Sequence, residues 1–118
     1  MLINLSNHPS DLWEGKQLEA AGQFGEIVDI PFPQVGPEAS HEDILALADK
    51  CVHAIEEKAQ DADITVHVMG EMTLTYAIVS RLKEMGIRCV ASTTERNTVV
   101  DDNGVKTSVF VFTMFREY

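Results

Sequence analysis

Segments with the two-residue repeat of a β-strand alternate along this chain with segments that have the longer repeat of an α-helix. Between the strand-like segments, apolar side chains recur at helical spacing, most clearly from Ile44 to Ala59. This alternation favours a parallel sheet with right-handed crossovers. We therefore expect an α/β fold, an open and mostly parallel sheet in the order 2-1-3-4 with helices on both faces. The four expected strands are residues 2–5, 27–30, 64–69 and 87–91.

Turn and capping residues mark where several of these elements end. Ser40 and Asp43 resemble a helix-capping box. Asn103-Gly104 lies between two strand-like runs, and this dipeptide is typical of a type I′ hairpin turn, in which both residues have positive φ. We expect a C-terminal antiparallel hairpin beside the fourth strand. Because residues 109–112 are all apolar, we also expect that stretch to be covered on both faces.

Length and charge limit the classes of protein that the chain can belong to. Its 118 residues suit a single domain spanning residues 1–118. The formal net charge of -10 argues against binding to duplex DNA, although helix N-termini can still bind a small anion locally. No apolar run approaches the ~20 residues that cross a bilayer, and no signal-peptide pattern opens the chain. We expect a cytoplasmic protein with no membrane partner.

Several residue types that often mark function are better interpreted as structural here. Cys51 and Cys89 lie in apolar patterns, which favours buried thiols over a disulfide. The four histidines lack metal-ligand spacing, and the familiar dinucleotide and P-loop fingerprints are absent, so we expect no metal and no cofactor. His67 alternates with valines, which favours a packed histidine over a ligand. Trp13 suits core packing better than stacking on a base.

Polar residues follow three of the expected strands. Ligands of open parallel sheets bind at the carboxyl ends of the strands. The expected strand order places the corners after the first and third strands side by side, with the corner after the fourth strand adjoining. We therefore expect a site for a small molecule or nucleotide. The three corners are Ser6-Asn7-His8, Met69-Gly70-Glu71-Met72-Thr73 and Ser92-Thr93-Thr94-Glu95-Arg96.

The corner after the third strand has two interpretations. Gly70 permits close approach of a backbone, and the amides of Glu71, Met72 and Thr73 could point at a phosphate. The alternative is a simple capping turn, because a negative Glu71 already suits a helix N-terminus. Glu71 could otherwise pair with Arg96, orient a ribose hydroxyl or act as a base.

The other two corners also have structural alternatives. Ser92, Thr93, Thr94 and Arg96 combine hydroxyls with a guanidinium, which suits phosphate recognition. They would otherwise form an exposed loop that leads into the hairpin. His8 is placed to act as a general acid or base, but it could equally belong to a turn and helix cap.

The chain resembles a known family at these residues. Small single-domain proteins identified as CRISPR-associated are similar to it over nearly its whole length. The resemblance implies a Rossmann-like, CARF-like domain that dimerises and binds cyclic oligoadenylate, the messenger of type III CRISPR antiviral defence, across the two-fold axis. The segments that carry the resemblance are Asn4-Leu5-Ser6-Asn7-His8-Pro9, Val68-Met69-Gly70-Glu71-Met72-Thr73 and Ala91-Ser92-Thr93-Thr94-Glu95-Arg96.

The resemblance also implies an activity and a set of site residues. Some relatives are ring nucleases, which cleave the messenger without metal by attack of a ribose 2′-hydroxyl on the adjacent phosphate. His8 and Glu71 would then move protons and Arg96 would stabilise the charge on the phosphate. A non-catalytic nucleotide sensor and a protein-interaction module without ligand remain as alternatives. The residues implied in ligand binding are Ser6, Asn7, Gly70, Met72, Thr73, Ser92, Thr93 and Thr94.

Overall fold

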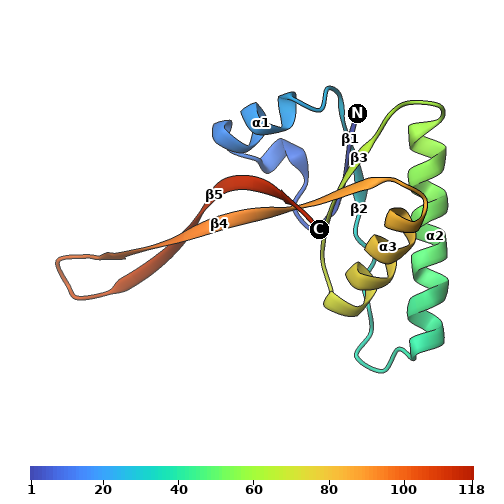
Figure 1. Cartoon of the computed structure of the whole chain (residues 1–118). Coiled ribbons are helices and arrows are strands. Elements are labelled where there is room, and N and C mark those ends of the chain that lie inside the picture. The colour runs from blue at the N-terminus through green and yellow to red at the C-terminus, as the bar shows by residue number, and fades with distance from the viewer.

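The computed structural model describes residues 1–118 and contains one five-stranded sheet in the order β2-β1-β3-β4-β5 (Figure 1). β1 pairs in parallel with β2 and β3, and β3 pairs in parallel with β4. β5 is antiparallel to β4. The predicted α/β fold and strand order are therefore confirmed. In chain order the elements are β1 (Leu2–Ser6), a 3₁₀ turn (Ser10–Leu12), α1 (Gly15–Gly22), β2 (Ile27–Pro31), α2 (His41–Ala59), β3 (Thr65–Met69), α3 (Met72–Glu84), β4 (Arg88–Val100) and β5 (Lys106–Glu117).

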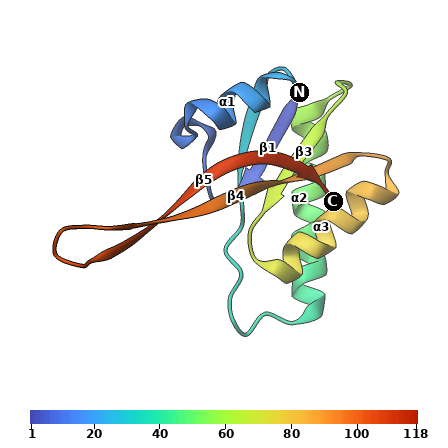
Figure 2. The same cartoon turned by 60° about the vertical axis from the view of Figure 1, so that its left-hand side comes forward.

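Helices cover both faces of the sheet, as Figures 1 and 2 show. Side chains alternate across a strand, so Leu2 faces α1 whereas Ile3 and Leu5 face α2 and α3. The larger core lies on the side of α2 and α3, and a smaller cluster around Trp13 lies under α1. Trp13 therefore packs in the core, as predicted. No helix combines the length and apolar character needed to span a membrane.

Local sequence signals explain most of the helix boundaries. The Ser40 hydroxyl accepts the amide of Asp43 while the Asp43 carboxylate accepts the amide of Ser40, so the predicted capping box at the start of α2 is present. Both cysteines are free and buried, as predicted. Burial raises the pKa of Cys89 to about 11, which keeps its thiol protonated at neutral pH.

β4 and β5 form a long two-stranded ribbon that extends away from the rest of the sheet (Figures 1 and 2). Only the first three residues of β4 pair with β3, whereas pairing with β5 continues to Val100 and Lys106. The prediction that the fourth strand ends at Ala91 and is followed by a polar corner is therefore wrong, because Ser92 to Arg96 lie inside β4. The alternative of an exposed loop is wrong for the same reason. Their polar side chains are tolerated in a strand because most of the ribbon is exposed to solvent.

The hairpin turn lies where it was predicted but has a different geometry. Gly104 has a φ of +77°, whereas Asn103 does not have positive φ, so the turn is not type I′. The carboxylate of Asp101 accepts the amides of Asn103 and Val105, each at 2.9 Å. The backbone carbonyl of Asp101 also accepts the amide of Gly104. The aspartate therefore stabilises a wider turn than the Asn-Gly pair alone indicates.

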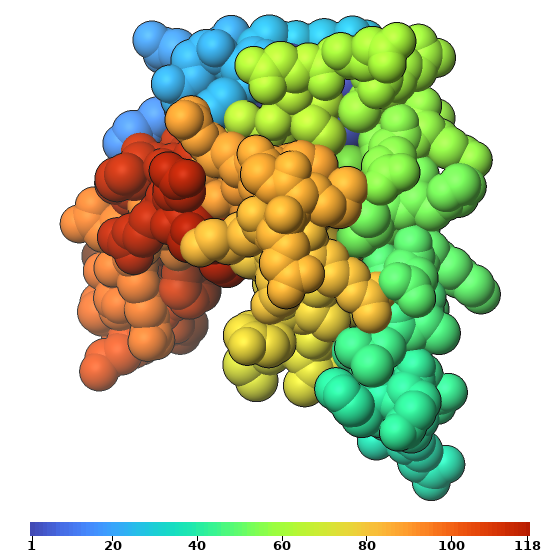
Figure 3. Space-filling view, turned by 45° about the vertical axis from the view of Figure 1, so that its right-hand side comes forward, coloured from blue at the N-terminus to red at the C-terminus, as the bar shows by residue number.

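The apolar stretch of β5 is less buried than we predicted. Val109 is 48% exposed and Phe110 is 66% exposed, whereas Phe112 is buried. The expectation that residues 109–112 are covered on both faces is wrong for the single chain. Val109 and Phe110 lie in the outer part of the ribbon, which is largely exposed to solvent. The space-filling view shows open space between the outer part of the ribbon and α3 (Figure 3).

Candidate functional site

A cavity of about 510 Å³ lies on the α1 side of the sheet, at the carboxyl ends of β1 and β3. Its volume is in the range typical of small-molecule sites. β4 and β5 form another wall, because the ribbon continues past the ends of the parallel strands. The lining residues are Ser6, Asn7, His8, Leu12, Glu14, Gln17, His67, Met69, Ser92, Thr94, Phe110 and Phe112. We call this space the carboxyl-edge cavity.

The carboxyl-edge cavity brings together part of the predicted site. Ser6, Asn7 and His8 line it, and so do Ser92 and Thr94. The predicted proximity of the first and last polar segments is therefore correct. The lining does not include Gly70, Glu71, Met72, Thr73, Thr93 or Arg96.

Glu71 is the N-cap of α3. Its carboxylate accepts the amides of Thr73 at 3.0 Å and Leu74 at 2.8 Å, and the Thr73 hydroxyl at 2.6 Å. The bond from that hydroxyl, followed by the two amide bonds, lowers the pKa of Glu71. The helix-start amide of Thr73 is therefore already bonded and does not point at a ligand. The capping interpretation of this corner is the one that the structure supports.

Met72 and Thr73 line a different surface. They border a groove between α2 and α3 together with Tyr76. Met72 is 84% exposed there. The structure therefore does not bring these two residues to the carboxyl-edge cavity, because α3 directs them toward its own solvent side.

Gly70 has a packing role. A Cβ atom at this position would overlap the ring of Phe32, which is buried against the end of the sheet. The absence of a side chain therefore serves the close approach of Phe32. The predicted approach of a ligand to Gly70 is replaced by the approach of this ring.

Arg96 does not line the cavity, but it lies on the ribbon directly opposite Phe110, which does. Its Nε and Nη2 atoms donate to the Ser108 hydroxyl at 3.1 and 3.0 Å. The pair of Arg96 and Phe110 lies two pairs further out along the ribbon than Thr94 and Phe112, and therefore on the same side. Its guanidinium therefore belongs to the outer rim of the cavity wall.

Thr93 faces away from this rim. Its hydroxyl donates to the backbone carbonyl of Met114 and accepts the Met114 amide, both at 3.2 Å. These bonds lie at a bulge between Thr93 and Thr94. Thr93 therefore stabilises the bulge and does not contribute to the cavity.

A chain of hydrogen bonds runs behind the cavity across β2, β1, β3 and β4. The Asn4 amide nitrogen donates to Asp29 Oδ1 at 2.9 Å, and Asn4 Oδ1 lies 2.8 Å from Nδ1 of His67. His67 Nε2 lies 2.8 Å from the Ser92 hydroxyl. Gln17 Nε2 donates to the same hydroxyl at 3.1 Å. We call Asp29, Asn4, His67 and Ser92 the cross-strand relay.

The directions of these bonds follow from the partners of Asn4. Its amide nitrogen donates to the carboxylate of Asp29 and to the carbonyl of His8, both of which only accept. Its oxygen therefore faces His67, so His67 Nδ1 must carry the proton. Neutral His67 then has an unprotonated Nε2, which accepts the proton of the Ser92 hydroxyl.

Burial keeps His67 neutral. The residue is 2% exposed, and burial, with a smaller contribution from His8, lowers its pKa to about 4. Trp13 and Phe115 pack edge-on against the imidazole, with ring centroids at 5.6 and 5.4 Å. His67 is packed, as predicted, but it also directs a lone pair toward a hydroxyl at the cavity.

Four further residues of the site and of the relay behind it were not predicted from the sequence: Asn4, Gln17, Phe110 and Phe112. Asn4 and His67 face each other in the register of β1 and β3, and this pairing is not visible along the sequence. A usable signal was present, because Asn4 and Ser6 alternate with buried apolar residues in a fully buried strand. Polar side chains in such a strand need partners.

The lining chemistry suits a base and a sugar better than a cluster of phosphates. No lysine or arginine lines the carboxyl-edge cavity, and Glu14 adds a carboxylate. Phe110 and Phe112 offer apolar faces, while Asn7 and Gln17 offer side-chain amides. Nowhere in the chain do three His, Cys, Asp or Glu side chains gather in a way that could hold a metal ion.

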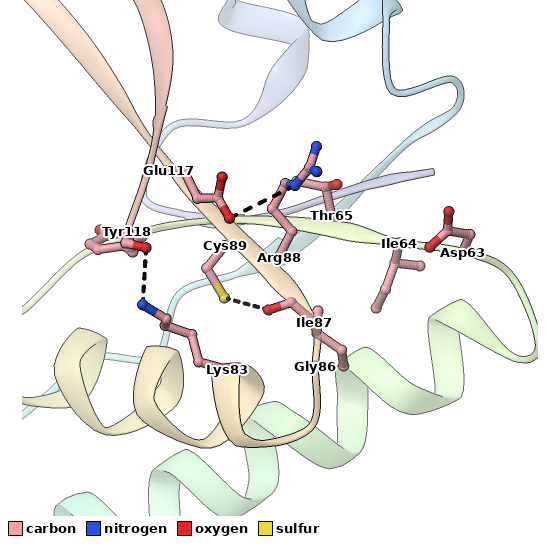
Figure 4. A pocket seen from close by; sticks show the side chains of 10 residues that line it. All are labelled: Asp63, Ile64, Thr65, Lys83, Gly86, Ile87, Arg88, Cys89, Glu117 and Tyr118. Carbon is pink, nitrogen blue, oxygen red and sulfur yellow. Dashed lines mark hydrogen bonds and ion pairs between the residues drawn. The ribbon is translucent and has the colours of Figure 1, made fainter.

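A second cavity lies at the opposite edge of the sheet, where β3 and β4 begin (Figure 4). Its polar groups are largely bonded to one another. Lys83 donates to the backbone oxygen of Tyr118 at 3.1 Å, and Arg88 lies 3.9 Å from Glu117. This edge is not where open parallel sheets bind ligands, so the carboxyl-edge cavity is the better candidate.

Comparison with known proteins gives a family for the chain. No curated protein matches it. The family described as "Uncharacterized protein MJ1673 family" matches residues 1–116. Because the match spans nearly the whole sequence, the chain belongs to the MJ1673 family.

Proposed function

We propose that this chain binds cyclic oligoadenylate in the carboxyl-edge cavity and cleaves the ring without a metal ion. The lining of the cavity is the observation that carries the proposal. Phe110 and Phe112 offer faces on which an adenine base can stack. The amides of Asn7 and Gln17 are the side-chain groups that pair best with the edge of adenine. The resemblance to CRISPR-associated proteins supports a ring as the ligand and a role in type III antiviral defence.

The phosphates of such a ligand would lie toward the rim. The lining has no lysine or arginine, so a phosphate deep in the cavity would have no cationic partner. Arg96 lies beyond Thr94 on the same side of the ribbon. A guanidinium there would bind phosphate oxygens and offset the charge that develops during cleavage. This placement supports the expected role of Arg96 better than a position inside the cavity would.

The proposal includes a homodimer. A ring-shaped ligand with repeated adenylates suits two copies of one cavity related by a two-fold axis. The ribbon supports this arrangement, because Val99, Val109 and Met114 are exposed on the side opposite Phe110. A second copy would cover these side chains.

The reaction needs little chemistry from the protein. A ribose 2′-hydroxyl held in line with the scissile phosphate supplies much of the rate through positioning alone. His8 lines the cavity, which supports a role in exchanging protons with the ligand. Glu71 is a weaker candidate for this role, since its carboxylate is engaged in capping α3.

The test is incubation of the pure protein with cyclic tri-, tetra- and hexa-adenylate, with and without EDTA. We expect one ring to raise the melting temperature, because a ligand that binds only the folded state stabilises it. We also expect linear products ending in a 2′,3′-cyclic phosphate, at a rate that EDTA does not change. Absence of both thermal stabilisation and product for all three rings would reject the proposal.

Two variants locate the binding site. Arg96→Ala should weaken binding about 10-fold or more by removing a charge-assisted hydrogen bond. Arg116→Ala is the matched control, because Arg116 lies on β5 and pairs with Ala91, nearer the opposite end of the same ribbon. Equal effects of the two variants would show a general effect of charge and remove Arg96 from the site.

A non-catalytic sensor is the second candidate. One observation favours it: of the three expected catalytic residues, only His8 lines the cavity. Binding of a ring that remains intact after long incubation would support the sensor. A binding protein of this kind would use the same cavity and the same dimer.

A further inference from the structure

Ser92 has one hydrogen-bonding position left for a group in the cavity. A serine hydroxyl has one proton and two acceptor lone pairs. The proton of Ser92 goes to His67 Nε2, and Gln17 Nε2 donates to one lone pair. Ser92 also lines the carboxyl-edge cavity. A donor in the cavity can therefore reach the remaining lone pair. The hydrogen bonds to His67 and Gln17 already fix the orientation of the hydroxyl.

The groups behind Ser92 follow the same order as in sites where a base activates a hydroxyl. A hydroxyl, an imidazole and an orienting amide follow one another at 2.8 Å in both steps. This spacing is within the range in which a base activates a hydroxyl while a third group holds the base in one tautomer. Asp29 lies behind Asn4 and fixes the direction of its amide.

We propose that Ser92 and His67 together accept the proton of a hydroxyl group of the bound ligand. The inference rests on the proposed function, in which that group is a ribose 2′-hydroxyl. Ser92 contacts the ligand and is the catalytic residue. His67 and Asn4 act through Ser92 and are positioning residues, with His67 receiving the proton.

The proposed reaction moves a proton from the ligand to His67 and cleaves one phosphodiester bond. The O2′ atom forms a bond to phosphorus as its proton passes to Ser92 Oγ and the proton of Ser92 passes to His67 Nε2. The bond from phosphorus to O5′ breaks, and O5′ takes up a proton from water. The products are a 2′,3′-cyclic phosphate and a 5′-hydroxyl. His67 then returns its proton through Ser92 to water.

The charged groups near His67 decide how the relay responds to pH. His8 and Glu14 line the same cavity, and Asp29 lies beyond Asn4. Trp13, Phe112 and Phe115 pack close by and do not titrate. With a pKa of about 4, His67 keeps Nε2 unprotonated at pH 7 and at pH 5.5. Cleavage through the relay should therefore persist at pH 5.5.

The experiment is a double-mutant cycle between Ser92 and the ligand's 2′-hydroxyl. The probes are the cyclic oligoadenylate that binds best among the tri-, tetra- and hexamers, and the 2′-deoxy ring of the same size. We expect the deoxy ring to bind the wild-type protein about 3- to 10-fold more weakly, which is the effect of one hydrogen bond. We expect Ser92→Ala to bind both rings equally.

Cleavage of the ribose ring gives the second measurement. Ser92→Ala should lower the single-turnover rate roughly 10²–10⁴-fold, because it removes the proton acceptor. Ser92→Thr retains a hydroxyl and should retain most of the rate. Thr98→Ala is the matched control, since it deletes an exposed hydroxyl of β4 that does not line the cavity. Circular dichroism checks that each variant is folded.

The outcomes separate this inference from the function on which it rests. If the wild-type protein binds no ring, the proposed function fails and the inference fails with it. If the wild-type protein binds a ring but does not cleave it, the function as a binding protein stands and the relay is rejected. Unchanged cleavage by Ser92→Ala, or equal binding of the two rings by the wild-type protein, also rejects the relay.

Discussion

The imidazole of His67 links the stability of the fold to pH. Its pKa is about 4 in the folded chain and 6.5 when unperturbed. The unfolded chain therefore binds the proton first, and stability is fully present above pH 6.5 and is lost as the pH falls toward 4. The full loss from this group is about 3 kcal/mol at about 1.4 kcal/mol per pH unit. Between pH 7.5 and 5 we expect urea unfolding to show a loss of about 2 kcal/mol.

Two variants assign this loss to His67. His67→Gln can still donate to Asn4 and accept from Ser92, but it does not titrate, so the pH dependence between 7.5 and 5 should flatten. His53→Gln is the control, because His53 is exposed and pairs only with Glu57 on the same helix. A pH dependence that survives in His67→Gln would contradict the prediction.

Glu71 gives a second prediction at the scale of a residue. The carboxylate accepts three hydrogen bonds from Thr73 and Leu74, so Glu71→Ala should lower the melting temperature and Glu71→Gln should lower it less. Neither variant should change ligand binding, because Glu71 does not line the cavity. Melting curves and binding isotherms check this. A loss of turnover of roughly 10²-fold in a stable Glu71→Gln protein would restore Glu71 as the base.

Individual residues show why only part of the site could be predicted. Ser6, Asn7 and His8 follow a strand directly, so the rule that ligands bind at strand ends found them. Glu71 follows a strand in the same way, but its backbone neighbours use its carboxylate. His67 was interpreted as packed because its burial is visible in the local pattern. Its contact with Ser92 depends on the register of two strands and is not visible there.

At the scale of elements, the corner between β3 and α3 depends on a contact with the segment after β2. A Cβ at Gly70 would overlap the ring of Phe32. We expect Gly70→Ala to destabilise the chain by about 1–3 kcal/mol, the usual cost of overpacking. Chemical denaturation measures the change.

A pair of variants tests the cause of that loss. In a Phe32→Leu background the ring is gone, so Gly70→Ala should cost clearly less than in the wild-type chain. Gly36→Ala is the control, since no atom lies within 4 Å of the position of its Cβ. It should change stability by less than about 0.5 kcal/mol. If Gly70→Ala lowered the free energy of unfolding equally in both backgrounds, the loss would come from the backbone conformation and not from the Phe32 ring.

The elements themselves were predictable to different degrees. The helix α2 and the parallel strands follow from local periodicity and capping, and these signals act over a few residues. The ribbon was missed in part because Ser92 to Arg96 are polar and resemble a loop. Their hydrogen bonds go to β5, about 20 residues later in the chain. Pairing with a distant strand on an exposed surface leaves no apolar pattern in the sequence.

At the scale of the whole molecule, the outer part of the β4–β5 ribbon is largely exposed to solvent. A two-stranded ribbon is only marginally stable in water unless something packs on it. Its exposed apolar side chains lie on both sides: Val99 and Val109 on one, Phe110 on the other. Exposed strand edges of this kind also promote pairing with other chains. These features are the physical basis for expecting a homodimer.

The dimer should therefore depend on the ribbon. We expect the mass of a dimer in sedimentation equilibrium at tens of micromolar, and a monomer for the variant Val99→Lys/Val109→Lys. Both substitutions lie on the side of the ribbon opposite Phe110, so they add charge to the interface without touching the carboxyl-edge cavity. Met72→Lys is the control, because it charges an apolar side chain on α3 that is even more exposed than the two valines. A dimer that Met72→Lys disrupts and the ribbon variant does not would move the interface to α3. A wild-type monomer at these concentrations would remove the two-fold site, and a ring ligand would then have to bind within one copy of the cavity.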